Sequence, residues 1–294
     1  MLFQTRTGNW PIGFRRGWSA WQKDLAGCLA WAKAQGFSVF DLGRDGDTLA
    51  AQVVEAGISI GSVDLLLWNE MMSPDAGKRE DAVVRNVAYV QACAKVGGGG
   101  VRNFFLAMLP EKPELLRAEN FAVLVSSLKL LVPELEKAGA RLVIEGWPGP
   151  GCLCCTPEGL RALFKEVPSA AVGINYDPSH LIRMGIDPIR FLYEFAPRVY
   201  HVHGKDTEIC PEAVYELGTE QPATFAKNPP FGGPTWRYTI PGHGCMRWTH
   251  AFQILQRHYY NGAVSIELED KNFNGTQEGE QAGLLLAARF LQGC

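Results

Sequence analysis

The feature of this sequence that most constrains its fold is an alternation of short β-rich runs with longer helical patterns, repeated eight times. The predicted strands are residues 10–14, 37–42, 58–66, 101–108, 141–145, 170–177, 198–203 and 263–268. The predicted helices are residues 18–34, 48–56, 75–96, 118–137, 157–165, 178–195, 247–258 and 277–291. Repeated strand–helix units of this kind indicate an α/β protein with a parallel sheet.

Eight such units favour a closed (β/α)₈ TIM barrel over an open sheet. An open doubly wound sheet would favour a glycine-rich phosphate loop after its first strand, whereas the glycine run Gly97–Gly100 precedes a strand. The 294 residues suit one barrel, which needs about 250 residues plus insertions. We therefore predict a single TIM-barrel domain over residues 1–294.

Composition and charge limit the kinds of molecule that this protein is expected to bind and where it is expected to act. The chain has 28 basic and 31 acidic residues and a net charge of −3, so it lacks the basic surplus that a nucleic-acid phosphate backbone requires. Its amino terminus has no apolar run of the signal-peptide type, and no later stretch could span a bilayer. We predict no nucleic acid, no membrane and a cytoplasmic location, with the eight cysteines reduced.

The sequence Cys152-Leu-Cys154-Cys155 contains a C-x-x-C spacing that could hold zinc or form a redox pair. Because no second C-x-x-C completes a tetrathiolate site, loop cysteines are the preferred interpretation.

One segment interrupts the alternation of predicted strands and helices. About 40 residues rich in Gly, Pro and aromatic side chains separate the seventh strand from the next helix. Long insertions in compact folds are usually functional. We predict that residues 206–246 form a lid-like insertion over the barrel mouth, the alternative being a surface decoration without a role in binding.

The chemistry is expected at the carboxyl ends of the strands, where barrel active sites lie. Four consecutive late strands end in a polar group: Glu145, Asp177, His203 and Glu267. A charged group closing an apolar strand is costly unless it is paired or metal-bound. Three carboxylates and an imidazole suit one divalent ion, for which we expect Mn²⁺ first, with Mg²⁺, Co²⁺ or Zn²⁺ as alternatives.

His201 lies two residues before His203 and points to the same side of an ideal strand. It could sit beside the ligands or replace His203 among them. We favour His203 because it ends the strand.

The ordered set of motifs resembles the xylose isomerase-like TIM-barrel family of sugar isomerases and epimerases, including ketose 3-epimerases. The motifs are Glu145-Gly-Trp-Pro, Asp177-Pro-Ser-His180, His203-Gly-Lys-Asp206, Pro241-Gly-His-Gly and Ser265-Ile-Glu267, all in the second half of the chain. The resemblance implies that Glu145, Asp177, His203 and Glu267 bind the metal and that Glu145 and Glu267 are also the catalytic acid and base. It further implies that His180 contacts substrate oxygens and that Asp206, in one motif with Lys205, lies beside the ligands.

The spacing from His203 to Glu267 is 64 residues, against 26 and 32 for the two preceding intervals. The excess lies in the insertion, so we expect substrate recognition there, with Arg237, Trp236 and His243 as candidate substrate-binding residues. Trp147 could line the pocket by stacking on a sugar face, or it could be ordinary barrel packing.

The leading prediction is a metal-dependent isomerase or epimerase of a sugar, keto-sugar or polyol, in which two glutamates move a proton through a metal-stabilised enediolate. The alternative is a lyase or dehydratase acting on a keto-sugar, keto-glycoside or inosose. An endonuclease IV-type nuclease is disfavoured because all six histidines lie in the second half of the chain. A non-catalytic sugar-binding protein would tolerate loss of Glu145 or Glu267, yet both are present. The subunit count stays open, a homo-oligomer included.

Overall fold

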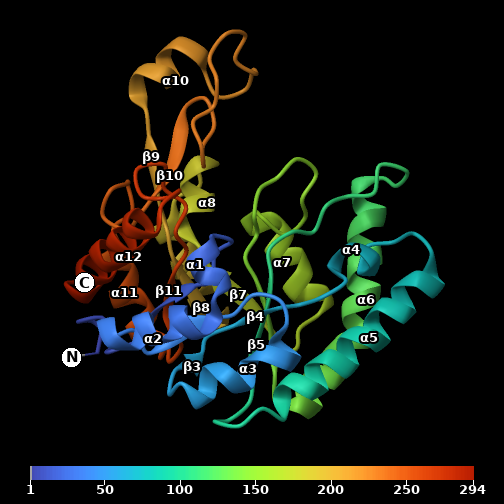
Figure 1. The fold of residues 1–294 in the computed structure, drawn as a ribbon. Helices are drawn as coiled ribbons and strands as arrows, with labels where there is room; N and C mark the ends of the chain where they lie inside the picture. Colours follow the sequence, from blue (N-terminus) through green and yellow to red (C-terminus); the bar gives the residue numbers. More distant parts are fainter. Residues whose placement is uncertain (1) are drawn as a thin grey trace. The chain divides into compact units, whose positions relative to one another are not determined.

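The computed structural model describes residues 2–294, in which parallel strands alternate with helices along the chain as predicted (Figure 1). Each of the eight segments predicted as strand contains a strand. Met1, which the single-domain prediction includes, lies outside the described residues. The chain divides into two compact units, which we describe separately. Within the described residues, the first unit is 2–40, Asp177–Pro197 and Val202–Cys294, and the second is Asp41–Tyr176 and Arg198–His201.

The second unit is a parallel sheet covered by helices. Its strands are β3 (Ser59–Ile60), β4 (Val63–Asp64), β5 (Asn103–Leu106), β6 (Arg141–Ile144) and β7 (Val172–Tyr176). Its helices are α3 (Gly46–Glu55), α4 (Trp68–Met71), α5 (Ala76–Ala94), α6 (Arg117–Ala138) and α7 (Pro157–Glu166). The order β4-β5-β6-β7 follows the sequence, with Phe104 opposite Leu142 and Leu142 opposite Val172.

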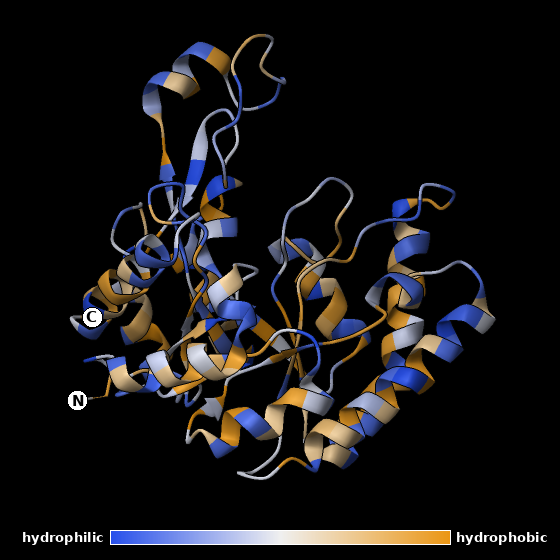
Figure 2. Ribbon diagram, viewed as in Figure 1, coloured by the Kyte–Doolittle hydropathy of each residue, from blue (hydrophilic) through white to orange (hydrophobic). Residues whose placement is uncertain are grey.

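All five residues of β7 are buried, as expected for a parallel strand covered on both faces. In Figure 2 β5 and β6 are mostly hydrophobic, whereas α5 and α6 alternate between hydrophobic and hydrophilic residues. The start of α7 is fixed by its sequence, because Thr156 accepts a hydrogen bond from the Gly159 N–H and Pro157 is the first helical residue. These contacts hold the loop between β6 and α7, which begins at Glu145.

The first unit contains parallel strands and an antiparallel hairpin. Its strands are β1 (Ile12–Arg15), the start of β2 (Val39–Asp41), the end of β8 (Val199–Gly204), β9 (Asp206–Ile209), β10 (Trp236–Thr239) and β11 (Val264–Ile266). Its helices are α1 (Ala20–Lys23), α2 (Leu25–Gln35), α8 (Pro178–Arg183), α9 (Pro188–Phe195), α10 (Pro211–Leu217), α11 (Trp248–Arg257) and α12 (Gln277–Gln292). Strand β11 lies between β1 and β8, with Val264 opposite both Ile12 and Val202.

The segment 206–246, which the sequence indicated only as a loop, contains regular structure. Strands β9 and β10 pair in antiparallel register, with Glu208 opposite Arg237 and Asp206 opposite Thr239, and α10 follows β9 (Figure 1). The role of this insertion as a lid stays a prediction.

Among the described residues no helix is both long enough and apolar enough to cross a membrane.

Candidate metal centre

Three of the four predicted ligands lie in the first unit, each at the carboxyl end of a parallel strand. His203 is the penultimate residue of β8 and lies opposite Ser265, and Glu267 directly follows β11. Asp177 directly follows β7 and is the N-cap of α8. Each of the three offers one ligand atom, and these atoms lie within 4.8 Å of one another. The buried Asp, His and Glu cluster is therefore a candidate divalent-metal site.

The two oxygens of Asp177 have different surroundings. Oδ1 accepts hydrogen bonds from the Ser179 N–H at 2.8 Å and the Ser179 hydroxyl at 2.6 Å, which fix the carboxylate at the start of α8. Oδ2 is buried and accepts no hydrogen bond from the residues that the structure describes. This buried carboxylate oxygen faces Lys205 Nζ at 3.2 Å and His180 Nε2 at 3.5 Å, so it lies where a cation is favoured and the donor set fits a divalent ion.

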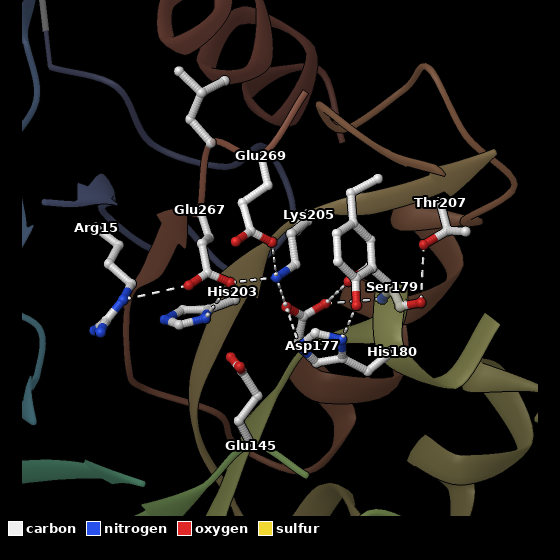
Figure 3. Close-up of polar contacts among 12 residues, drawn as sticks. Arg15, Glu145, Asp177, Ser179, His180, His203, Lys205, Thr207, Glu267 and Glu269 are labelled. Atoms are coloured by element: carbon white, nitrogen blue, oxygen red, sulfur yellow. Dashed lines mark hydrogen bonds and ion pairs between the residues drawn. The ribbon is translucent and has the colours of Figure 1, made fainter. Parts of the chain in front are cut away.

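From its sequence position Lys205 is expected beside the predicted ligands, and in the structure its side chain contacts two of them directly. Its side chain is buried, and Nζ lies 3.2 Å from Asp177 Oδ2 and 3.1 Å from Glu269 Oε2, and also contacts Glu267 Oε2 (Figure 3). The ammonium also lies 4.5 Å from the centre of the Tyr238 ring. One cation thus neutralises part of the charge of three carboxylates, which would otherwise repel one another.

Glu267 is held as a carboxylate by its neighbours. Burial raises the pKa of Glu267, but the positive charges of Lys205 and Arg15 and the contact with His203 outweigh it and hold the pKa well below its ordinary value of 4.5. Arg15 Nε lies 3.3 Å from Glu267 Oε1, and His203 Nδ1 lies 3.5 Å from Oε2. An ionised carboxylate at this position can both bind a cation and accept a proton.

His180 is buried between Asp177 and the hairpin. Its Nδ1 lies 2.7 Å from the hydroxyl of Tyr238, and its Nε2 lies 3.5 Å from Asp177 Oδ2. Since Tyr238 is on β10 and His180 is on α8, this hydrogen bond connects the inserted hairpin to the helix that Asp177 caps.

The remaining predicted residues of the cluster belong to the second unit. Glu145 directly follows β6, and its Oε2 accepts a hydrogen bond from Asn175 Nδ2 at 2.7 Å. His201 is fully buried, and its Nε2 lies 2.8 Å from Asp41 Oδ2. The choice of His203 over His201 as the ligand stays a prediction. Trp147 lies in the loop after β6.

Asp206 organises the turn that follows the hairpin. Its carboxylate accepts hydrogen bonds from the backbone N–H groups of Thr207, Gly242 and Met246 and from Trp248 Nε1, at 2.8 to 3.2 Å. Burial raises its pKa, although these four donors act in the opposite direction. A Cβ on Gly244 would lie 2.2 Å from Asp206 Oδ1, so the turn requires glycine there.

Of the three candidate substrate-binding residues of the insertion, Trp236 is half-buried under the Arg183 guanidinium, and the other two have different environments. Arg237 is held by carboxylates on both sides, with Nε 2.5 Å from Glu208 Oε2 and Nη1 3.1 Å from Asp270 Oδ1. His243 is exposed, and its ring centre is 6.2 Å from that of Phe273. A role for either residue in substrate binding stays a prediction.

Comparison with known proteins shows which family this chain belongs to. The family model for the xylose isomerase-like TIM barrel matches residues 25–293. The chain belongs to the xylose isomerase-like TIM barrel family.

The matching relatives of this TIM-barrel family are distant. The protein YfiH of Bacillus subtilis, whose function is uncharacterised, is 32% identical over 166 residues, 55% of this chain and 50% of that protein. An inosose dehydratase of Clostridium beijerinckii is 28% identical over 151 residues, 51% of this chain and 48% of the enzyme. The alignments thus span about half the length of these relatives. The structure of 3-keto-D-glucoside 4-epimerase from E. coli superposes with a TM-score of 0.67 at 15% identity, covering 97% of this chain and 100% of the epimerase, and shares the fold.

In this xylose isomerase-like barrel, sequence reasoning missed several contacts of the cluster. Arg15 ends β1 and Glu269 lies two residues after Glu267, so both could have been found by reading every strand end for charged groups. Tyr238 and Asn175 carry no such signal, because their roles depend on which side chain lies opposite in the folded chain.

A carboxylate next to the cluster anchors the loop after β1. Glu280, buried in the first turns of α12, accepts hydrogen bonds through Oε2 from the Ser19 hydroxyl at 2.6 Å, Trp21 Nε1 at 2.7 Å and Gln22 Nε2 at 2.9 Å. Burial raises the pKa of Glu280, but the three donors outweigh it and lower the pKa below 4.5. The loop that carries Trp18 is therefore held by one charged residue.

Replacing Glu280 by Gln is expected to lower the melting temperature by a few degrees at neutral pH, because a neutral amide accepts these hydrogen bonds less strongly than a carboxylate. The lowered pKa means that this stabilisation is present above about pH 4.5 and is lost as the pH falls through the pKa of the folded state. Thermal melts of wild type and variant between pH 7 and pH 3.5 measure it, with the exposed neighbour Glu278→Gln as control. If the difference in melting temperature between wild type and Glu280→Gln grew as the pH fell, the stabilising role of the ionised Glu280 would be contradicted.

Proposed function

We propose that this protein is a divalent-metal-dependent isomerase or epimerase of a sugar, keto-sugar or polyol, in which Glu145 and Glu267 transfer the proton. The observation that carries the proposal is the cluster of Asp177, His203 and Glu267, in which Glu267 is held ionised by its neighbours. An enzyme that moves a proton between adjacent carbons needs a carboxylate base and a cation beside the reacting oxygens.

Glu145 completes the proposed ligand set of Glu145, Asp177, His203 and Glu267. It follows its strand directly, as Asp177 and Glu267 follow theirs, and Asn175 fixes one of its oxygens at 2.7 Å. Its other oxygen would serve as ligand and proton carrier. Mn²⁺ is the proposed ion, with Mg²⁺, Co²⁺ or Zn²⁺ able to use the same oxygen and nitrogen donors.

When bound, the ion would stabilise the negative charge that develops on substrate oxygens as the proton leaves the neighbouring carbon. In the proposed mechanism one glutamate removes the proton from one face of the carbon, and the other returns a proton. The face and carbon of return decide between epimerisation and isomerisation. Arg15 and Lys205 hold Glu267 as the carboxylate that the first step requires.

The proposed substrate contacts come from the residues around this cluster. His180, fixed by Tyr238, would donate to or accept from a substrate hydroxyl, and Trp147 and His243 would contact the sugar from the loops after β6 and β10. Arg237, engaged by Glu208 and Asp270, would act by holding the hairpin in place.

A lyase is the second candidate, because the curated relative from Clostridium beijerinckii is named an inosose dehydratase. The buried Lys205 ammonium beside Glu267 could protonate a departing hydroxyl, a step that isomerisation does not need. In this version the first proton removal is the same, and water leaves from the next carbon.

Exchange of carbon-bound hydrogen for deuterium tests the proposal and separates the two candidates. Ketoses, inososes and 3-keto-glycosides are incubated in D₂O with Mn²⁺-loaded protein and, in parallel, with chelator. We expect exchange at carbon only with the metal, accompanied by a new stereoisomer for an epimerase or by loss of water for a dehydratase. Absence of exchange across the whole panel would rule out proton transfer at carbon.

A further inference from the structure

A cavity of about 420 Å³ lies in the first unit next to the candidate metal centre. Glu267 forms part of its wall, so the cavity adjoins the proposed catalytic base, whereas Asp177 and His203 are not among its lining residues. The other walls come from the loop after β1, the loop after β11, the start of α12 and the insertion before β10, and include Arg16, Trp18, Phe231, Asn274 and Glu280. Its volume is within the range of small-molecule sites, about 300–1,000 Å³.

Two aromatic side chains at this cavity are unusually placed. Trp18 is 76% exposed, although a tryptophan gains free energy when it is covered. Phe231 is 38% exposed and has a positive φ of 55°, a conformation that a residue with a Cβ rarely adopts. Phe231 is held there because its C=O accepts the Tyr238 N–H at 2.8 Å. Exposed aromatic faces at a cavity are surfaces on which a sugar or aromatic ring can stack.

The cavity is also preformed. Glu280 binds Ser19, Trp21 and Gln22, and so fixes the loop that carries Trp18. The Asn274 side chain accepts the Asp270 N–H at 2.8 Å, which fixes the opposite loop. Fixed walls lower the cost of ordering a ligand.

The charges at the cavity favour a neutral ligand over an anion. Of its two arginines, Arg15 faces Glu267 at 3.3 Å, and Arg16 donates to the backbone C=O groups of Gln22 and Lys23 at 2.9 and 3.0 Å. Each guanidinium group thus contacts an acceptor within the protein, and the carboxylates of Glu267, Glu269 and Glu280, which also line the wall, outnumber the two arginines. Carboxylates accept hydrogen bonds from hydroxyl groups and repel phosphate.

We propose that this cavity binds the second, uncharged ring of a glycoside whose reacting sugar lies at Glu267, so that the substrate is a keto-glycoside rather than a free monosaccharide or a sugar phosphate. The placement of the reacting sugar rests on the proposed function. The second ring would stack on Trp18 or Phe231 and hydrogen-bond to the carboxylates of the wall.

A matched substrate pair tests the proposal. Exchange of carbon-bound hydrogen is measured in D₂O with Mn²⁺-loaded protein for 3-keto-glucose, for 3-keto-cellobiose oxidised on its non-reducing ring, and for 3-keto-glucose 6-phosphate. We expect kcat/KM to be at least about tenfold higher for the disaccharide, the effect of one or two aromatic contacts. Trp18→Ala and Phe231→Ala should each reduce this ratio several-fold, whereas Phe225→Ala, at a 94% exposed position of the same insertion, should leave it unchanged. A higher kcat/KM for the monosaccharide or the phosphate would overturn the proposal.

A binding measurement keeps the cavity testable if no compound exchanges. Binding of cellobiose, which has no keto group, is followed by saturation-transfer NMR on the metal-free protein. Binding that is lost in Trp18→Ala and retained in Phe225→Ala supports the second-ring site even if the proton-transfer function fails. No binding of cellobiose to the wild-type protein, together with equal exchange of the two keto-sugars, would refute the site.

Discussion

Replacing Glu267 by Gln is expected to lower kcat by at least about 10³-fold, with Mn²⁺ at saturating concentration and the protein still folded. The amide keeps the shape of the side chain and one oxygen that can accept from Lys205, so the surroundings of the cluster should persist. It cannot take a proton from carbon, and it is a much weaker metal ligand than the carboxylate that the neighbouring cations hold ionised.

The measurement is hydrogen exchange or product formation with the best substrate of the panel, together with a thermal melt of each variant. Glu269→Gln is the matched control, because Glu269 also contacts Lys205 at 3.1 Å but is not one of the proposed ligands. We expect that control to lose less than about tenfold. Glu145→Gln should match Glu267→Gln in its loss of kcat, because the amide cannot carry a proton. The glutamine oxygen can still accept the hydrogen bond from Asn175, so the fold around it should persist. Near-normal turnover by either glutamate variant would refute the two-glutamate mechanism.

The second large effect is expected on metal affinity. Asp177→Asn should weaken Mn²⁺ binding by at least about 100-fold, more than is usual for loss of a residue that only supports a ligand. Asparagine can keep the Oδ1 hydrogen bonds to Ser179, but it places an NH₂ group where Oδ2 faces Lys205 at 3.2 Å. The ion then loses a charged ligand, and two donors face each other.

Isothermal titration with Mn²⁺, or the electron paramagnetic resonance signal of free Mn²⁺, measures this affinity without relying on turnover. Ser179→Ala is the control, because it removes one hydrogen bond to Asp177 and keeps the ligand. We expect it to weaken binding by roughly tenfold or less. If Asp177→Asn bound Mn²⁺ like the wild type, Asp177 would not be a ligand.

The sequence was most informative where local pattern and fold rules agree. The eight strand positions could be predicted because each strand is a short apolar run followed by a helix, and the barrel rule then placed the chemistry at the strand ends. Asp177, His203 and Glu267 were singled out in this way, and one potential ligand atom of each lies within 4.8 Å of the others; their binding of a metal stays a prediction. The two histidines of β8 could not be separated by alternation, since residues two apart share a face, and the choice between them stays a prediction.

The sequence was least informative where contacts join distant segments. Strands β9 and β10 are four residues each and are separated by α10 and a long loop, so no local periodicity reveals their pairing. The Glu208–Arg237 ion pair follows from that register. Likewise, the place of Lys205 among three carboxylates depends on three segments that only the fold brings together.

The buried Lys205 has a consequence for the order in which the protein is assembled. Three neighbouring carboxylates without a cation would oppose folding, and many metal sites form only when the ion binds. Here the chain supplies its own positive charge, so we expect the barrel to fold before it meets a metal ion. Loading would then be an exchange between partners, in which the ion would replace the ammonium at Asp177 while Lys205 keeps its contact with Glu269. A cell short of the metal would accumulate a folded, inactive protein ready to be loaded, rather than an unfolded chain.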